Sequence, residues 1–184
     1  MRILFFAAFL LAVQSCTLVT SKNIPGKKEK AFSSKLIGRY ELILPSDFAS
    51  MMGDNKIFVE LKSDRIVLDN AGKVDETILN DSLYYTSIGK STYLCMGAEP
   101  ELTVFKMVPG KNEIKLYPMF ATAETKSEAL SEYFTEVEEI PGEPDENGEV
   151  GESSFSVHIV DNKLDKFFSS SVAYKEPFVL KKVK

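Results

Sequence analysis

Residues 57–70 read IFVELKSDRIVLDN, and they contain two apolar runs separated by a two-residue polar break. In the first run, three apolar residues fall on one face: Ile57, Val59 and Leu61. This period of two is the pattern of a half-buried β-strand, because a helix would place its apolar residues three or four apart. A polar break at 63–64 followed by a second run at 65–68 is typical of a β-hairpin. The stretch therefore predicts two antiparallel strands.

The same pattern extends in both directions from this hairpin. Upstream, residues 36–44 (LIGRYELIL) alternate in the same way. Downstream, short segments rich in aromatic and β-branched residues predict further strands at 82–88, 91–96, 102–108, 113–120, 157–160, 163–168 and 178–183. Residues 125–128 resemble a capping box and precede helically spaced apolar residues up to 134, which predicts one helix. We also expect 48–52 to form a short helix or a lid-like loop.

These elements predict an all-β fold of about 8–10 short strands with one short helix, as an antiparallel barrel or sandwich. There is no rhythm of alternating strands and helices that would indicate a parallel sheet. The predicted domain spans residues 36–184.

The N-terminus predicts export. Arg2 is followed by an apolar run of eleven residues, 3–13. That run is too short to cross a bilayer of about 30 Å, which takes about 20 apolar residues, but it suits the core of a signal peptide. We therefore predict that residues 1–15 are a signal peptide.

Residues 13–16 (VQSC) resemble the lipobox of bacterial lipoproteins, although Gln14 stands where a small residue is usual. The resemblance implies cleavage before Cys16, acylation of its thiol, and attachment of the protein to a membrane of the cell envelope. The alternative is ordinary signal-peptide cleavage, which would give a secreted protein with an unmodified Cys16.

The segment that follows, 16–35, contains five lysines and a Pro-Gly pair. Its composition predicts a flexible tether carrying the lipid anchor, since so few apolar groups cannot offset the entropy of ordering. Without residues 1–15 the chain has 169 residues and a net charge of −6. Basic residues gather only near its two ends, which argues against nucleic acid as a partner.

Catalytic and metal-binding patterns are missing from the sequence. His158 is the single histidine, and Cys95 lies in an apolar strand where a buried structural thiol is expected. The acidic segment 136–152 carries eight acidic residues, but its spacing does not match an EF-hand, so we expect a solvated hairpin tip. We predict no catalytic residue, no metal site and no cofactor. Paired carboxylates of a hydrolase stay a distant alternative.

Two short motifs resemble lipocalin-like (calycin-type) bacterial lipoproteins. Residues 36–42 (LIGRYEL) are similar to the opening strand of that family, with Tyr40 in place of its tryptophan. The segments 161–164 and 178–183 are similar to its closing hairpin. The resemblance implies an up-and-down β-barrel in which the Tyr40 ring plugs one end, covered by Lys181 or Lys182.

Two functions follow as expectations. In the first, the barrel holds a small hydrophobic or amphipathic ligand in a cavity formed by aromatic side chains, with candidates Tyr40, Phe58, Tyr84, Tyr93, Phe105 and Tyr117. In the second, the domain is a structural or interaction lipoprotein that docks on an envelope protein, with 136–152 as one contact surface. An enclosed cavity would favour the first function, and a barrel filled by side chains would favour the second.

Overall fold

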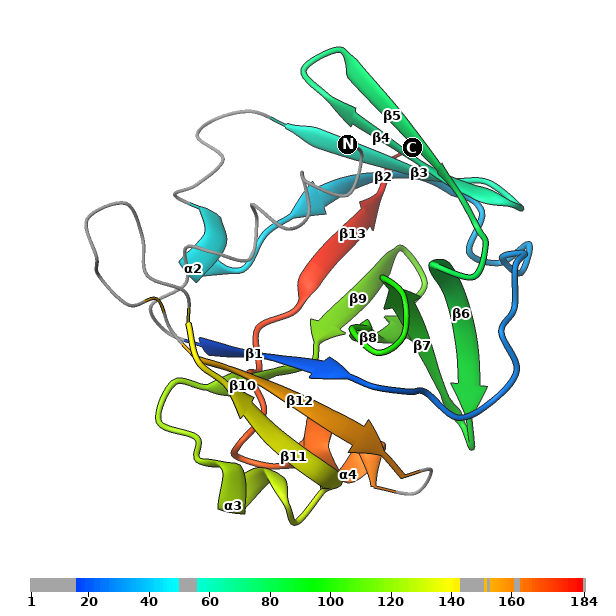
Figure 1. Ribbon diagram of the computed structural model, residues 1–184. Helices are drawn as coiled ribbons and strands as arrows, with labels where there is room; N and C mark the ends of the chain where they lie inside the picture. Colours follow the sequence, from blue (N-terminus) through cyan, green and yellow to red (C-terminus); the bar gives the residue numbers. More distant parts are fainter. Residues whose placement is uncertain (1–15, 50–55, 143–150, 152, 161–162, 184) are drawn as a thin grey trace.

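The computed structural model describes residues 16–49, 56–142, 151, 153–160 and 163–183 (Figure 1). The described residues form thirteen strands in two sheets, together with three short helices. The larger sheet contains β2 (Gly38–Ile43), β3 (Ile57–Leu61), β4 (Arg65–Asn70), β5 (Lys73–Ile78), β6 (Leu83–Ile88), β7 (Ser91–Met96), β8 (Thr103–Pro109), β9 (Glu113–Pro118) and β13 (Phe178–Lys182). The smaller contains β1 (Cys16–Ser21), β10 (Phe120–Thr122), β11 (Phe134–Ile140) and β12 (Ser154–Ile159). The helices are α2 (Ser46–Ala49), α3 (Ser127–Leu130) and α4 (Leu164–Ser169).

The nine-stranded sheet has the strand order of an up-and-down barrel. Its order is β5-β4-β3-β2-β13-β9-β8-β7-β6, and every neighbouring pair is antiparallel. The sheet curls so that one face becomes concave, and β5 and β6 are its two edges (Figure 1). The predicted all-β, barrel-like fold is confirmed, as a curled half-barrel rather than a closed ring.

The hairpin predicted at 57–70 is confirmed as β3 and β4, with Val59 opposite Leu68. The next strand, β5, was not predicted, because three of its six residues are charged. A tight turn at Ala71 and Gly72 joins it to β4, with φ of 49° and 85°. Two consecutive residues of positive φ are the signature of the two-residue hairpin turn that matches strand twist.

Two hydrophobic cores lie on opposite faces of the large sheet. The first core fills its concave, inner face. The second core lies behind β6, β7 and β8, where the small sheet and α4 cover them. Val19 of β1, Phe155 of β12 and Phe167 of α4 pack there against Tyr93 and Val104 of the large sheet. Three strands of the barrel wall are therefore buried on both faces.

The expected flexible tether at 16–35 is corrected by the structure. Residues 16–21 form β1, an inner strand of the small sheet that pairs with β10 and, in parallel, with β12. The next residues, 22–36, which we call the strap, pass the edge of β6 and then reach the turn between β3 and β4. The Glu29 N–H donates to the Tyr85 carbonyl at 2.8 Å, and the Phe32 N–H to the Ser63 carbonyl at 2.7 Å. The folded domain therefore includes residues 16–35.

The physical reason lies in how the lysines of this segment are used. Lys22 pairs with Glu138 at 3.2 Å, Lys28 with Glu99 at 3.3 Å, and Lys30 with Asp81 at 2.9 Å. In the sequence these lysines suggest a solvated tether, but in the fold they pair with acidic side chains at the surface of the domain. The apolar residues of the segment enter the cores, among them Val19, Ile24 and Phe32.

Other local predictions are also corrected. The helix predicted over 125–134 is only α3, and its N-cap Lys126 makes no side-chain capping bond, so the capping box does not form. The strand predicted at 163–168 is the helix α4, whose buried Leu164 and Phe167 have helical spacing. The short helix expected around Phe48 is α2, whereas 50–52 lie outside the described residues. Of the acidic segment, 136–140 belong to β11, and 143–150 lie outside the described residues.

Candidate functional site

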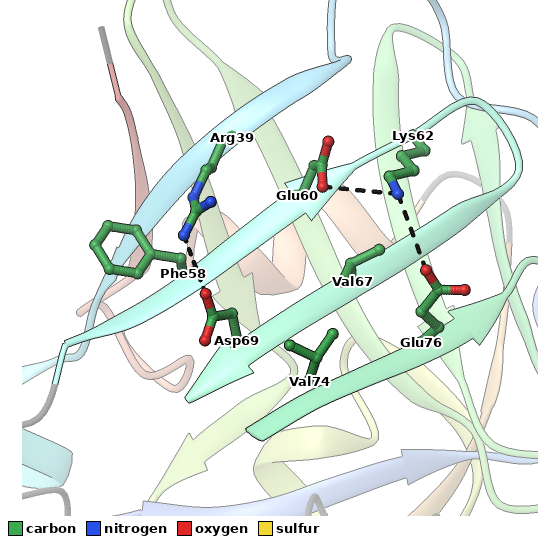
Figure 2. A pocket seen from close by; sticks show the side chains of 8 residues that line it. All are labelled: Arg39, Phe58, Glu60, Lys62, Val67, Asp69, Val74 and Glu76. Carbon is green, nitrogen blue, oxygen red and sulfur yellow. Dashed lines mark hydrogen bonds and ion pairs between the residues drawn. The ribbon is translucent and has the colours of Figure 1, made fainter. Parts of the chain in front are cut away.

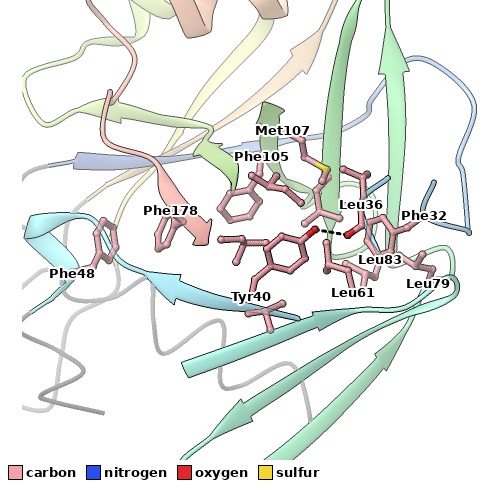
Figure 3. Packing of buried hydrophobic residues seen from close by; sticks show 14 of the residues in the cluster. Phe32, Leu36, Tyr40, Phe48, Leu61, Leu79, Leu83, Phe105, Met107 and Phe178 are labelled. Carbon is pink, nitrogen blue, oxygen red and sulfur yellow. Dashed lines mark hydrogen bonds between the residues drawn. The ribbon is translucent and has the colours of Figure 1, made fainter. Parts of the chain in front are cut away.

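The six aromatic candidates do not surround one cavity. Tyr40 and Phe105 lie in the first core, inside the curl of the large sheet (Figure 3). The Tyr40 hydroxyl donates to the Leu36 carbonyl at 2.8 Å. The Lys182 side chain passes beside the Tyr40 ring, since both border the space where Gly38 would carry a Cβ. The side chains of Tyr40 and Phe105 are both buried.

The other four candidates lie elsewhere. Tyr84 and Tyr93 are buried in the second core, on the opposite face of the sheet. Phe58 lies half-buried on the outer face of β3, and Tyr117 is half-buried opposite Lys106, on the face of β9 that points away from Leu116. Both faces of β6 and β7 are buried, so apolar residues occur on both. The sequence pattern therefore cannot show which side chains of these strands point to which core.

One end of the barrel interior is closed by α2. Phe48 of this helix is fully buried, and its ring lies 5.2 Å from the Phe178 ring and 6.3 Å from those of Phe120 and Tyr174, centre to centre. The Tyr174 hydroxyl donates to the Asp47 carboxylate at 3.0 Å, which fixes the helix in place. Buried side chains of the first core therefore pack together along the concave face of the large sheet, from Phe48 at one end to Phe32 and Leu79 (Figure 3).

Neither cysteine is presented as a reactive group. Cys95 is fully buried beside Tyr84, and burial raises the pKa of its thiol to about 12. A thiol at this pKa is almost entirely protonated at neutral pH, so it is a poor nucleophile. Cys16, the candidate for lipidation, is the first residue of β1; it is 6% exposed and packs in the first core.

A polar cluster that the sequence did not reveal joins α4 to the barrel wall. The Asp165 carboxylate accepts hydrogen bonds from the Tyr93 hydroxyl at 2.8 Å and the Ser91 hydroxyl at 2.7 Å, and it pairs with Lys106 at 2.7 Å. Burial acts to raise the pKa of Asp165, but these donors hold it below its ordinary value. A carboxylate with a lowered pKa and three polar partners is a poor general base. We call Asp165 and these partners the clamp, because they hold α4 against the barrel wall.

This clamp predicts a dependence of stability on acid. Since the folded pKa is lowered, the contribution of Asp165 is fully present above its unfolded pKa of about 3.9 and is lost as pH falls below that value. We expect Asp165→Asn to cost about 1–2 kcal/mol at pH 7 and to flatten the acid limb of stability below pH 4, measured by urea unfolding at several pH values. Asp75→Asn, which makes the same change on the exposed strand β5, is the control. Equal acid limbs for wild type and Asp165→Asn would contradict the assignment.

Two pockets that described residues form lie on the surface. One lies beside α3, and the other is a groove of about 260 Å³ on the outer face of β2 to β5 (Figure 2). We call the second the outer groove. It is lined by Arg39, Phe58, Glu60, Lys62, Val67, Asp69, Val74 and Glu76.

The outer groove has an apolar floor between two sets of ion pairs. Val67 lies buried at the floor, although it is on the outer face of the sheet. At one end, Arg39 pairs with Asp69 at 3.0 Å and covers the Phe58 ring at 4.7 Å. At the other end, Lys62 lies 3.9 Å from Glu76 (Figure 2). Exposed ion pairs such as these are each worth less than about 1 kcal/mol, so a partner can displace them at little cost.

The groove opens onto β5, the edge strand of the large sheet. All six residues of β5 are exposed, and Val74 and Ile78 are the most exposed large apolar side chains of the described residues, at 61% and 54%. The other edge, β6, is bordered by the strap. β5 ends its sheet with no strand beyond it among the described residues, and its hairpin with β4 projects from the barrel (Figure 1).

No group of three or more histidine, cysteine or acidic side chains in the described part of the chain is placed to hold a metal ion. Within the same residues, no helix has the length and apolar character needed to cross a membrane. Comparison with protein-family models, with curated proteins and with solved structures finds no match to this chain.

Proposed function

We propose that this protein is an exported interaction protein of the cell envelope, whose β5 edge and outer groove dock an extended segment of a protein partner. The observation that carries the proposal is β5 itself, which exposes an edge and two large apolar side chains beside a groove with an apolar floor. Adding a strand to an exposed sheet edge is a common mode of protein recognition, in which main-chain bonds give affinity and side-chain pockets give specificity.

The first core supports docking rather than the alternative of a bound small molecule. The inner face of the large sheet is occupied by buried residues, and α2 closes one end with Phe48. The outer groove and the pocket beside α3 both lie on the outside of the molecule. A ligand would have to displace buried aromatic side chains, each of which contributes several kcal/mol to stability.

Site-specific photo-crosslinking tests the docking proposal. A photoreactive amino acid replaces Ile78 in the full chain, expressed in its own envelope, and replaces Ile43 in a matched control. Ile43 is 44% exposed but lies on β2, three strands from the edge. We expect a discrete crosslinked product from position 78 that is absent at position 43. Products of equal yield from both positions, or none from position 78, would contradict docking at β5.

The lipobox-like stretch 13–16 supports a further part of the proposal, which is acylation of Cys16 and anchoring in the membrane. In the fold, acylation requires the thiol to leave the first core. Because Cys16 pairs with Thr122 at the very start of β1, that movement would disturb only the terminal pair of the strand.

We expect Cys16→Ser to release the protein from the membrane fraction, because serine offers no thiol for acylation. The matched control is Cys95→Ser, which also changes a buried thiol but should leave the protein membrane-bound. Protease resistance of both variants shows whether the domain is still folded. Membrane association that persists in folded Cys16→Ser would eliminate the anchor.

A further inference from the structure

The register of the β4–β5 hairpin shows which main-chain groups of β5 point to the free edge. Asn70 and Lys73 close the two-residue turn, and residues that close such a turn bond to each other. The alternation continues to the far end of the hairpin, where the Leu79 N–H donates to the Asp64 carbonyl at 2.8 Å. Odd-numbered residues of β5 therefore bond to β4. The N–H and C=O groups of Val74, Glu76 and Ile78 point away from the sheet.

The side chains of these same three residues are arranged symmetrically. Val74 and Ile78 lie two residues before and two residues after Glu76, on the outer face of β5. If a second copy of β5 approached antiparallel with Glu76 on a two-fold axis, Val74 of each copy would lie opposite Ile78 of the other. Every outward-pointing N–H and C=O of the three residues would then find a partner, giving six main-chain bonds.

The charge at the axis fits this arrangement. Like charges directly opposite each other destabilise a strand pair, and the two Glu76 side chains would face each other. In each copy, however, Glu76 already pairs with Arg65 at 3.0 Å and lies 3.9 Å from Lys62. Four basic groups would thus surround two carboxylates. On the other face, Asp75 would lie opposite Thr77, with no pair of like charges.

We infer that the occupant of the β5 edge is a second copy of this chain, joined in an antiparallel pair with the two-fold axis at Glu76. The inference rests on the proposed function, of which it names the partner. Charged residues on an edge strand commonly prevent such pairing. Here Glu76 is compensated within its own chain by Arg65 and Lys62, and Val74 and Ile78 are more exposed than any other large apolar side chain of the described residues. The pair would join two curled sheets into one continuous sheet and bury Val74 against Ile78.

Sedimentation velocity of the purified full chain tests the association, from about 1 to 300 µM, a range that covers contacts of small area. We expect a monomer–dimer equilibrium that Ile78→Lys and Val74→Pro abolish. Proline at 74 removes an N–H that points to the free edge and leaves the bonds to β4 intact. The control, Ile43→Lys, makes the same change as Ile78→Lys on β2 and should dimerise like the wild type. Circular dichroism confirms that each variant is folded.

Disulfide trapping tests the register. In Glu76→Cys the two introduced thiols would face each other across the axis, at the Cα separation of about 5.5 Å that a disulfide accepts. In Val74→Cys the two introduced thiols would lie four positions apart along the paired strands. That separation of about 13 Å is too long for a disulfide. We expect a covalent dimer from Glu76→Cys alone; equal yields from both variants would refute the register. A chain monomeric at all concentrations would overturn the dimer. Docking itself is tested separately by the crosslinking at positions 78 and 43, so the two can fail independently.

Discussion

A chain carrying Val19→Asp is expected not to fold at 25 °C. Val19 is fully buried in the second core and lies on β1, between β10 and β12. An unpaired carboxylate at such a site costs several kcal/mol, which is comparable with the 5–15 kcal/mol of a typical domain. Far-ultraviolet circular dichroism and urea unfolding measure the effect.

The matched control for this substitution is Ile43→Asp, which makes the same type of change at an exposed position of β2. Its effect should stay within about 1 kcal/mol. If residues 16–35 were a tether outside the fold, Val19→Asp would also be neutral. A cooperative unfolding transition at wild-type urea concentration for Val19→Asp would therefore disprove the placement of β1.

Phe48→Ala is expected to lower the free energy of unfolding by about 3–5 kcal/mol, as removal of a fully buried aromatic side chain does. Among the described residues, the rings of Phe120, Tyr174 and Phe178 pack around Phe48, so its truncation leaves a cavity between them. Urea unfolding measures this loss. We expect the midpoint to fall while the m-value, the slope of the free energy of unfolding against urea concentration, stays unchanged.

Phe58→Ala is the comparison for this second variant. It removes the same side chain from the outer face, where the ring is half-buried under Arg39. We expect a loss of about 1 kcal/mol, since little cavity is left behind and a single exposed cation–π contact is weak. Similar losses for the two variants would mean that α2 does not close the barrel.

The alternation in residues 57–70 was sufficient to predict the hairpin and the all-β fold, because a half-buried antiparallel strand must alternate. It was insufficient for β1, where lysines downstream suggested a solvated tether. The lysines of this segment form ion pairs with residues distant in sequence, Lys22 with Glu138 and Lys30 with Asp81, and these pairs exist only in the folded chain. Composition carries no information on such distant pairs.

The candidate site was harder to predict for a different reason. Aromatic residues were sound indicators of burial at Tyr40 and Tyr93, but the two lie in different cores on opposite faces of one sheet. The proposed docking edge, β5, contains no aromatic residue. The sequence feature that marks this edge is the pair Val74 and Ile78 within a charged segment. Such a segment resembles a loop in the sequence, and only its pairing with β4 shows that it is a strand.

Native mass spectrometry of the full chain, after exposure to a total lipid extract, tests most directly whether the function resides on the outer edge rather than in the barrel interior. We expect a species of twice the mass of the chain that carries no non-covalent lipid, and we expect Ile78→Lys to give a monomer without lipid. A single chain bearing one bound lipid, unaffected by Ile78→Lys and lost when Tyr40 and Phe105 are truncated, would contradict this expectation. That result would make the protein a ligand carrier.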